Sequence, residues 1–184
     1  MANKNSQNPI SYIDPFTDVK NSEISGKDRE IILDVKEKRS FDSIYEALNA
    51  AVGTDYTGWM KATWPGKYNS LPFRIWFPKL AETRNGELVA SSNDCLNTIS
   101  EDWNEVVYDD LKKRHVEGGE RYTGSTLIFA KEPKGGPYIF RGAYVEDFEK
   151  SEPNHYVHKR IATKVRLIGK PAYDIELIDE ISYQ

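Results

Sequence analysis

The stretch from Pro137 to Gly169 decides the fold: PYIFRGAYVEDFEKSEPNHYVHKRIATKVRLIG. It contains two runs, 138–148 and 155–169, in which apolar or aromatic residues largely alternate with polar ones. Alternation with period two is typical of β-strands that bury one face. The segment KSEPN between the runs has the composition of a turn. The two runs are therefore expected to be consecutive antiparallel strands.

Similar patterns extend this sheet in both directions. STLIFAKE at 125–132 and AYDIELID at 172–179 have strand composition, and PKGGP at 133–137 is a turn. Upstream, EIILDVKE at 30–37 and the aromatic run FRIWFPKLA at 73–81 are also expected to be strands.

Two helices are expected beside these strands. In 41–52 the apolar residues recur at helical spacing, with Ser40 as the N-cap and Gly53 as the stop. The second helix is expected to begin after Ser100, with acids in its first turn and bases in its last, and to end at Gly118-Gly119. The combination predicts an α+β fold: a curved mixed or antiparallel sheet, or a small barrel, with flanking helices.

Length and composition limit the classes of protein to consider. The chain has 184 residues, enough for one domain at 28–184 after a polar N-terminal arm at 1–27. Its net charge of −4 argues against a uniformly electropositive nucleic-acid wrapper. The single cysteine, Cys95, excludes an intrachain disulfide framework. No apolar run is long enough to span a bilayer and no apolar leader is visible, so a cytoplasmic protein without a membrane partner is expected.

Gly142 interrupts an aromatic row. Alternation places Tyr138, Phe140, Gly142, Tyr144 and Phe148 on one face of their strand. A glycine inside a strand marks a bulge or bend, or a close approach by a ligand or another backbone. One interpretation is a bend whose aromatic neighbours fill the core, which is the more frequent use of such a glycine. The other is a slot where a flat ring stacks on Phe140 or Tyr144.

The following strand carries a basic stripe. Alternation assigns its apolar residues to the core and gives the other face Tyr156, His158, Arg160, Lys164 and Arg166. No acid occurs between Asn154 and Tyr173, whereas 101–110 contains five acids and no base. One interpretation is a solvated face paired with acids of neighbouring elements. The other is a stripe that holds phosphates beside an aromatic slot, as in nucleic-acid binding by charge and base stacking.

From Phe73 to Ile168 the order of elements resembles the PUA-like superfamily, which includes EVE, YTH and ASCH domains. Gly124-Ser125 before Leu127-Ile128-Phe129 stands where the family has a Gly-Asp-led strand, with Ser125 replacing the aspartate. Gly142-Ala143-Tyr144-Val145 is similar to the family's glycine-bearing strand. The resemblance implies a curved sheet with a pocket for a base, often a modified base of RNA or DNA. It also implies an aromatic cage, for which the candidates are Trp64, Trp76, Tyr138 and Tyr144.

The runs FRGAY at 140–144 and RIAT at 160–163, of the form F-x-G-x-Y and R-I-A-T, are similar to uncharacterised domains found beside HNH nucleases in bacterial restriction systems. This sequence has no HNH segment, so that nuclease activity is not transferred to it. A different nuclease remains an alternative, because Asp34-x-Lys36 has the form of the second half of a PD-(D/E)xK motif. Its missing acid would come from Asp14, Asp18 or Asp28.

Other enzyme classes find little support. His155 and His158 are three residues apart on one strand, so they point to opposite faces and do not suggest a shared metal. Cys95 lies in a polar segment without an evident base. The hypothesis is therefore a non-enzymatic reader of RNA or DNA, without cofactor or metal, in bacterial or phage defence. Stacking is assigned to the aromatic slot and phosphate binding to Arg160, Lys164 and Arg166. A protein-interaction module, including a homodimer, is the main alternative.

Overall fold

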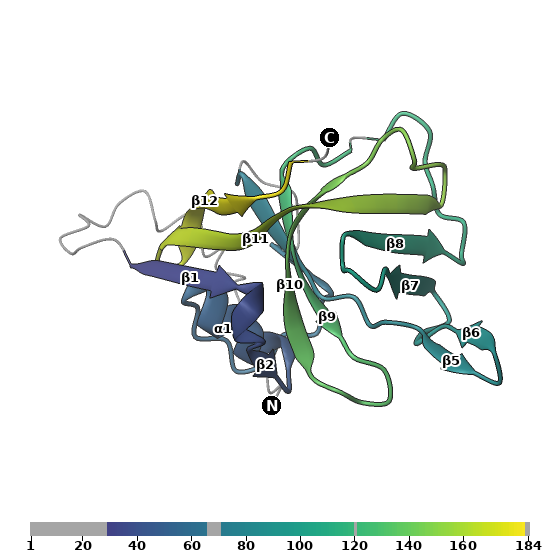
Figure 1. Ribbon diagram of the computed structural model, residues 1–184, viewed down its shortest axis with the longest axis horizontal. Helices are drawn as coiled ribbons and strands as arrows, with labels where there is room; N and C mark the ends of the chain where they lie inside the picture. The colour runs from purple at the N-terminus through teal and green to yellow at the C-terminus, as the bar shows by residue number, and fades with distance from the viewer. Residues whose placement is uncertain (1–28, 66–70, 120, 183–184) are drawn as a thin grey trace, which may run out of the picture.

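The computed structural model describes residues 29–65, 71–119 and 121–182, so the arm predicted for 1–27 lies outside the described residues. Strands dominate this part of the chain (Figure 1). They are β1 (Glu30–Asp34), β2 (Ser40–Phe41), β3 (Thr63–Trp64), β4 (Phe73–Trp76), β5 (Glu82–Arg84), β6 (Glu87–Val89), β7 (Cys95–Ile99), β8 (Glu105–Asp110), β9 (Ser125–Lys131), β10 (Tyr138–Glu146), β11 (His155–Gly169) and β12 (Ala172–Glu180). The strands predicted from period-two patterns are confirmed.

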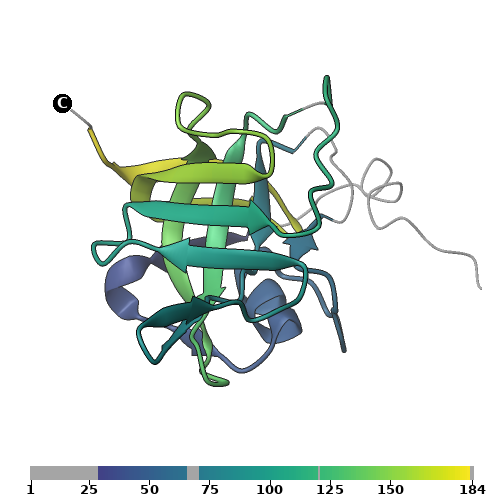
Figure 2. The same cartoon turned by 90° about the vertical axis from the view of Figure 1, so that its right-hand side faces the viewer.

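One mixed sheet organises the fold. Its main path is β3-β4-β9-β10-β11-β8-β7, with β1 and β12 added along β11 and β2 along β10. The β4–β9 pair is parallel and the other pairs are antiparallel. In Figure 2 the teal strands β7 and β8 run across the green strands β9 and β10, which shows how strongly the sheet curves. Within the described residues β3 does not pair with β7, so the sheet is not a closed barrel.

The described residues contain one α-helix, α1 (Ile44–Val52), and one short 3-10 helix, η1 (Val35–Glu37). The predicted first helix is confirmed, but Ser43 rather than Ser40 caps it, in a capping box with Glu46. Gly53 ends it in the left-handed conformation, at a φ of 76°. No helix in this part of the chain has the length and apolar character needed to cross a bilayer.

The predicted second helix is wrong, because the residues after Ser100 form a turn and then β8. The Ser100 hydroxyl donates to Asp102 and accepts from the backbone N–H of Glu105, which closes the β7–β8 hairpin. Ser and Asp satisfy local backbone groups in tight turns as readily as at helix caps. The β-branched pair Val106-Val107 then suits a strand that pairs with both β7 and β11. Of the two flanking helices that were predicted, only α1 is present among the described residues.

Strand β10 bends at Gly142, and the protein's own atoms fill the slot that was predicted beside this glycine. Its φ is 122°, and a Cβ built there would lie 2.6 Å from the carbonyl oxygen of Ala162 on β11. The β9–β10 register shifts between Phe140 and Gly142. The shift breaks the predicted aromatic row, because Phe140 packs in the larger core cluster and Tyr144 in a second, smaller one. The bend interpretation is thus confirmed at this position.

Candidate nucleic-acid interface

The predicted basic stripe is occupied by interactions within the protein. Arg160 is buried, and its guanidinium donates to the carbonyl of Asp102 at 2.9 Å and to Asn104 Oδ1 at 2.8 Å. Arg160 therefore ties β11 to the β7–β8 turn instead of facing solvent.

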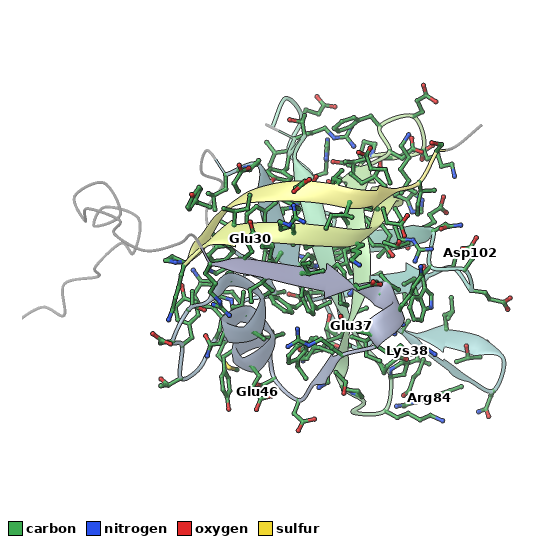
Figure 3. The ribbon with its side chains drawn as sticks, turned by 60° about the vertical axis from the view of Figure 1, so that its left-hand side comes forward. Glu30, Glu37, Lys38, Glu46, Arg84 and Asp102 are labelled. Carbon is green, nitrogen blue, oxygen red and sulfur yellow. The ribbon has the colours of Figure 1, made fainter. Side chains whose placement is uncertain are left out.

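The other two cations of the stripe are paired with carboxylates. Lys164 Nζ lies 3.4 Å from Asp34, and Arg166 lies 3.6 Å from Glu30 and 2.5 Å from Glu176. Glu30 is seen at the start of β1, beside β11, in Figure 3. The interpretation of a face paired with acids of neighbouring elements is confirmed here, and the stripe does not offer free charge to phosphates.

Two of the four residues of the predicted aromatic cage, Trp64 and Tyr144, also belong to the core, as does Phe140 of the predicted slot. Trp64 is 1% exposed, and Phe140 and Tyr144 are similarly buried. These three rings pack against apolar neighbours within the described residues, which leaves no room beside them for a base. Trp76, Tyr138 and His158 are placed differently, because all three line a cavity.

This cavity has a volume of about 1040 Å³ and opens between β4, β7, β8, β11 and the segment that follows α1. That volume is at the upper end of pockets that hold drug-sized ligands. It is large enough for a nucleotide whose base has left the stack. Of the ten residues predicted from sequence for the nucleic-acid site, the structure brings together the three named above.

An aromatic wall runs along one side of the cavity. Tyr108 on β8 and Tyr156 on β11 are directly opposite in register, with ring centroids 5.7 Å apart. The Trp76 ring, on β4, has its centroid 6.0 Å from that of Tyr108 and 5.3 Å from that of His158. We call these four residues the aromatic wall. Their rings come from three strands that the curvature of the sheet places side by side.

His158 contributes a neutral ring to this wall. Burial, and secondarily the positive charge of Arg74, lower the pKa of His158 from 6.5 to about 4. Arg74 Nη2 lies 3.5 Å from His158 Nε2. The prediction that His158 belongs to a solvent-facing basic face is therefore wrong, although the residue itself lies at the cavity.

The rim of the cavity carries mixed charge. Arg74 donates to Thr126 Oγ1 at 2.9 Å and stacks over Tyr122 at 4.6 Å, while Arg121 pairs with Glu146 and lies over Phe148. The loop from 111 to 119, which joins β8 toward β9, is exposed along its length and carries Lys112 and Lys113. The basic side chains that line the cavity are Arg74, Lys79, Arg114, Arg121 and Lys131.

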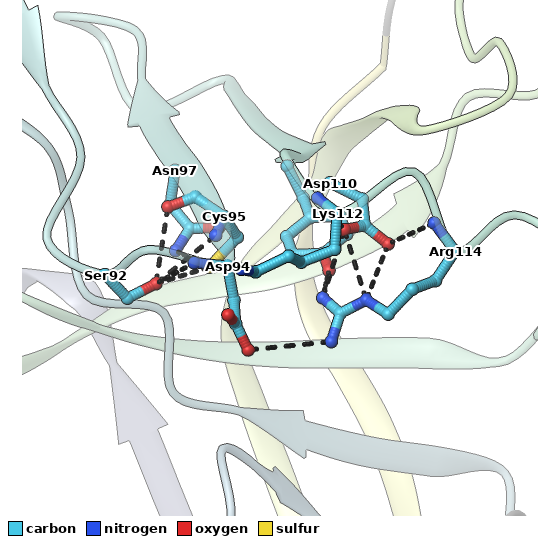
Figure 4. A network of polar contacts seen from close by, with 8 residues as sticks. Ser92, Asp94, Cys95, Asn97, Asp110, Lys112 and Arg114 are labelled. Atoms are coloured by element: carbon cyan, nitrogen blue, oxygen red, sulfur yellow. Dashed lines mark hydrogen bonds and ion pairs between the residues drawn. The ribbon is translucent and has the colours of Figure 1, made fainter.

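Arg114 holds the loop against the wall (Figure 4). Its guanidinium donates to both carboxylate oxygens of Asp110, at 3.0 to 3.2 Å, and to the Tyr108 hydroxyl at 3.3 Å. Asp94 lies 3.6 Å from the same guanidinium. The hydrogen bond from Arg114 is the main reason why the pKa of Asp110 is lowered and that of Arg114 raised. The loop is thereby fixed over the Tyr108 edge of the cavity.

Three polar atoms on residues that line the cavity have no hydrogen-bond partner among the described residues. They are the acceptor Asn97 Oδ1, the donor Trp59 Nε1, and His158 Nδ1. Buried polar groups are normally paired, so unpaired ones at a cavity suggest groups that a ligand satisfies.

The nuclease alternative gains no support from Asp34. Its carboxylate accepts from the backbone N–H of Lys36 at 2.9 Å, caps η1 and pairs with Lys164. The described part of the chain contains no group of three His, Cys, Asp or Glu residues that could hold a metal ion. Asp14, Asp18 and Asp28, the proposed sources of a second acid, lie outside it.

Comparison with known families agrees with this architecture. The SRA family, the SET and RING associated domain, matches residues 27–167. The chain belongs to the SRA family. The match confirms the PUA-like resemblance, since the SRA domain is a PUA-like fold.

A solved structure shares the SRA-type fold of this chain. It is titled "The 5-Hydroxymethylcytosine-Specific Restriction Enzyme AbaSI", and it matches with a TM-score of 0.54 and 21% sequence identity. The match covers 76% of this chain but only 43% of that one, so this chain corresponds to less than half of the enzyme. A search of curated proteins found no match.

Sequence reasoning missed Tyr108, Asn97 and Arg74, which all line the cavity. Tyr108 was missed because it fell within the helix that was wrongly predicted after Ser100. Its strand pairing with Tyr156 could therefore not be anticipated. The run EVVYDD could have indicated a strand, because it contains adjacent β-branched residues and no strong helix former after Glu105. Nothing in the sequence alone would have brought Arg74 next to His158.

Proposed function

We propose that this SRA-family chain is a DNA-binding module that recognises a modified cytosine and holds the extruded base in its cavity. The observation that carries the proposal is the aromatic wall along a cavity of about 1040 Å³. Stacking on aromatic side chains contributes about 1–3 kcal/mol per base. Extruding a base costs a few kcal/mol, so several such rings offset much of that cost.

Family membership supports the choice of nucleic acid. SRA domains bind DNA, which favours DNA over RNA for this chain. The structure with the shared fold is named as a restriction enzyme specific for 5-hydroxymethylcytosine, which supports a modified cytosine and a role in restriction. Within this proposal the chain reads DNA and does not cut it.

In this proposal the phosphate contacts are made by the loop beside the cavity and not by the basic stripe of β11. Arg160, Lys164 and Arg166 are engaged within the protein, whereas Lys112 and Lys113 are exposed on the loop beside the cavity. Charged groups of this kind position a protein on the DNA backbone without reading sequence. Base recognition is left to the cavity.

The test is a titration of the full chain with fluorescent duplexes that differ at one base: cytosine, 5-methylcytosine or 5-hydroxymethylcytosine. A matched RNA duplex is the control for nucleic-acid type. We expect at least one modified DNA duplex to bind about tenfold more tightly than its unmodified counterpart, with affinity that falls as salt rises. Equal affinity for all three DNA duplexes contradicts the proposal. No binding to any of them favours the protein-interaction alternative instead.

A further inference from the structure

The turn that follows β8 is organised around one carboxylate. Asp110 accepts from the backbone N–H groups of Lys112 at 2.9 Å and Arg114 at 3.2 Å, and from the Arg114 guanidinium at 3.0 to 3.2 Å. Figure 4 shows these three residues together. A short acidic side chain that accepts from backbone N–H groups just after it in the chain stabilises a turn in this way. We call residues 110–114 the Asp110 turn.

Polar contacts hold this turn more than burial does. Every residue from 111 to 119 is exposed, so packing contributes little to the position of the backbone. Lys113 has a φ of 52°, in the left-handed region, which costs a residue with a side chain about 1–2 kcal/mol. A backbone of this kind persists only where its surroundings stabilise it. The Asp110 carboxylate and the Arg114 guanidinium are therefore expected to determine the shape of the turn.

The turn is also attached to the strands beside it. The carbonyl of Asn154, directly before β11, accepts from the backbone N–H of Asp110 at 2.8 Å, and its side-chain oxygen accepts from that of His115 at 3.0 Å. The Arg114 guanidinium donates to the Tyr108 hydroxyl at 3.3 Å. The two ends of the turn are thus fixed relative to β8 and β11.

Two lysines lie on this turn. Neither Lys112 nor Lys113 forms an ion pair within the described part of the chain, whereas Lys164 and Arg166 on β11 both do. A cation on a backbone that is already ordered loses less conformational entropy on binding than a cation on a mobile segment. The shape of the turn therefore affects how strongly these lysines can bind phosphates.

Asp110 places a negative charge beside this proposed DNA-binding loop, which on charge alone weakens DNA binding. However, its side chain is only 8% exposed, and Arg114 donates to both of its oxygens. Bidentate pairs of this type combine charge neutralisation with a defined geometry. The contribution of Asp110 is therefore mainly the geometry of the turn.

We propose that Asp110 and Arg114 are positioning residues for the DNA backbone, which together hold the turn in the shape that lets Lys112 and Lys113 contact phosphates. An acidic residue beside the cavity then strengthens DNA binding instead of weakening it. The effect is the same for modified and unmodified DNA, because neither positioning residue reads the base. This inference rests on the proposed function, since it requires that the loop beside the cavity contacts DNA.

The experiment measures how the affinity of the full chain depends on salt, with the three DNA duplexes named above. Asp110→Asn removes a negative charge but sets an NH₂ donor among the donors that the carboxylate accepts from. We expect this variant to bind all three duplexes about fivefold or more weakly near physiological salt. The slope of log affinity against log salt should fall by up to about 2, as if both lysines were lost.

A double-mutant comparison separates position from charge. In the wild type, Lys112→Ala with Lys113→Ala should weaken binding, whereas in the Asp110→Asn background the same pair of changes should alter affinity by less than about twofold. Arg114→Lys keeps the positive charge but cannot form the bidentate contact, so it should resemble Asp110→Asn. It also covers the case that Asp110→Asn does not fold, which thermal melting of every variant checks.

Glu117→Gln is the matched control, because it removes the same charge from the same loop. Glu117 is exposed, and its side chain makes no hydrogen bond or ion pair with the residues that the structure describes. This variant should bind DNA at least as tightly as the wild type. Removal of the two lysines should keep its full effect in the Glu117→Gln background.

The outcomes separate this inference from the function on which it depends. If the wild type prefers a modified cytosine but Asp110→Asn binds DNA as tightly as the wild type, the inference fails and the proposed function stands. The inference also fails if Asp110→Asn weakens only the modified duplexes, since that indicates contact with the base. If the variants behave as expected but the wild type binds all three duplexes equally, recognition of a modified cytosine fails and the inference stands. If the wild type binds no DNA, both fail.

Discussion

Tyr108 and Tyr156 face each other across β8 and β11, with ring centroids 5.7 Å apart and planes inclined by 35°. Trp76 meets the Tyr108 ring edge-on from β4, at an interplanar angle of 80°. The three rings therefore present surfaces of different orientation to one cavity. Such an arrangement can support a flat ligand on one face while enclosing its edge.

Trp76→Ala should remove the largest ring of this wall. We expect the affinity for DNA that contains the preferred modified cytosine to fall by about 1–3 kcal/mol, or roughly 5- to 150-fold, because a stacking surface is lost. Fluorescence anisotropy at fixed salt measures the change. Tyr173→Ala is the control, since Tyr173 is a partly exposed ring on β12 that does not line the cavity. Equal losses in the two variants would contradict the assignment of the wall.

Gly142→Ala should destabilise the fold strongly. A Cβ there would lie 2.6 Å from the Ala162 carbonyl oxygen, in addition to the strain of a φ of 122°. We expect the free energy of unfolding to fall by about 3 kcal/mol, measured by chemical denaturation. The control is Gly86→Ala, where φ is 84° but a Cβ meets nothing within 4 Å. That change should cost only about 1–2 kcal/mol, and a similar loss in both variants would show that the approach of β11 is unimportant.

The fate of the predicted residues shows what a sequence can reveal here. Period-two patterns located the strands because alternation is a local property, and the glycine in β10 was recognised as a bend for the same reason. The register shift at Gly142 was not visible, yet it moves Tyr144 out of the row that holds Phe140. A one-residue shift reverses the face of every later side chain in a strand. Errors of this kind cannot be corrected from alternation alone.

The candidate site was only partly predictable because it depends on pairings between distant strands. Trp76 and His158 were selected from their own strands, but their contact at 5.3 Å results from the curvature of the sheet. Lys164 and Arg166 looked unpaired because their acidic partners lie on other elements, β1 and β12. Arg160 looked unpaired because its partners, the Asp102 carbonyl and the Asn104 amide oxygen, lie in the β7–β8 turn. A local excess of charge in a sequence therefore does not establish a charged surface.

Removal of Lys164 and Arg166 together should leave DNA binding nearly unchanged. Both side chains pair with carboxylates away from the cavity, so the double variant Lys164→Ala with Arg166→Ala should alter affinity by less than about twofold. By contrast, Lys112→Ala with Lys113→Ala should reduce the slope of log affinity against log salt by up to about 2, if each lysine contacts one phosphate. Salt titrations of the two double variants measure this directly. The reverse ranking would restore the basic stripe as the phosphate-binding surface.

His158 should make the folded state sensitive to mild acid. Its pKa is about 4 in the folded protein against 6.5 in the unfolded chain, because burial and Arg74 disfavour the charged ring. Between these values the unfolded chain binds a proton that the folded protein does not, so stability falls as the pH is lowered from about 6.5 to 4. The loss from this residue is on the order of 3 kcal/mol and is absent above pH 6.5. Denaturation of the wild type and of His158→Gln from pH 7.5 to 4 tests it. Acid-sensitive carboxylates are common to both proteins, so the difference between the two curves isolates His158, and parallel curves would mean that its ring is not held neutral by burial.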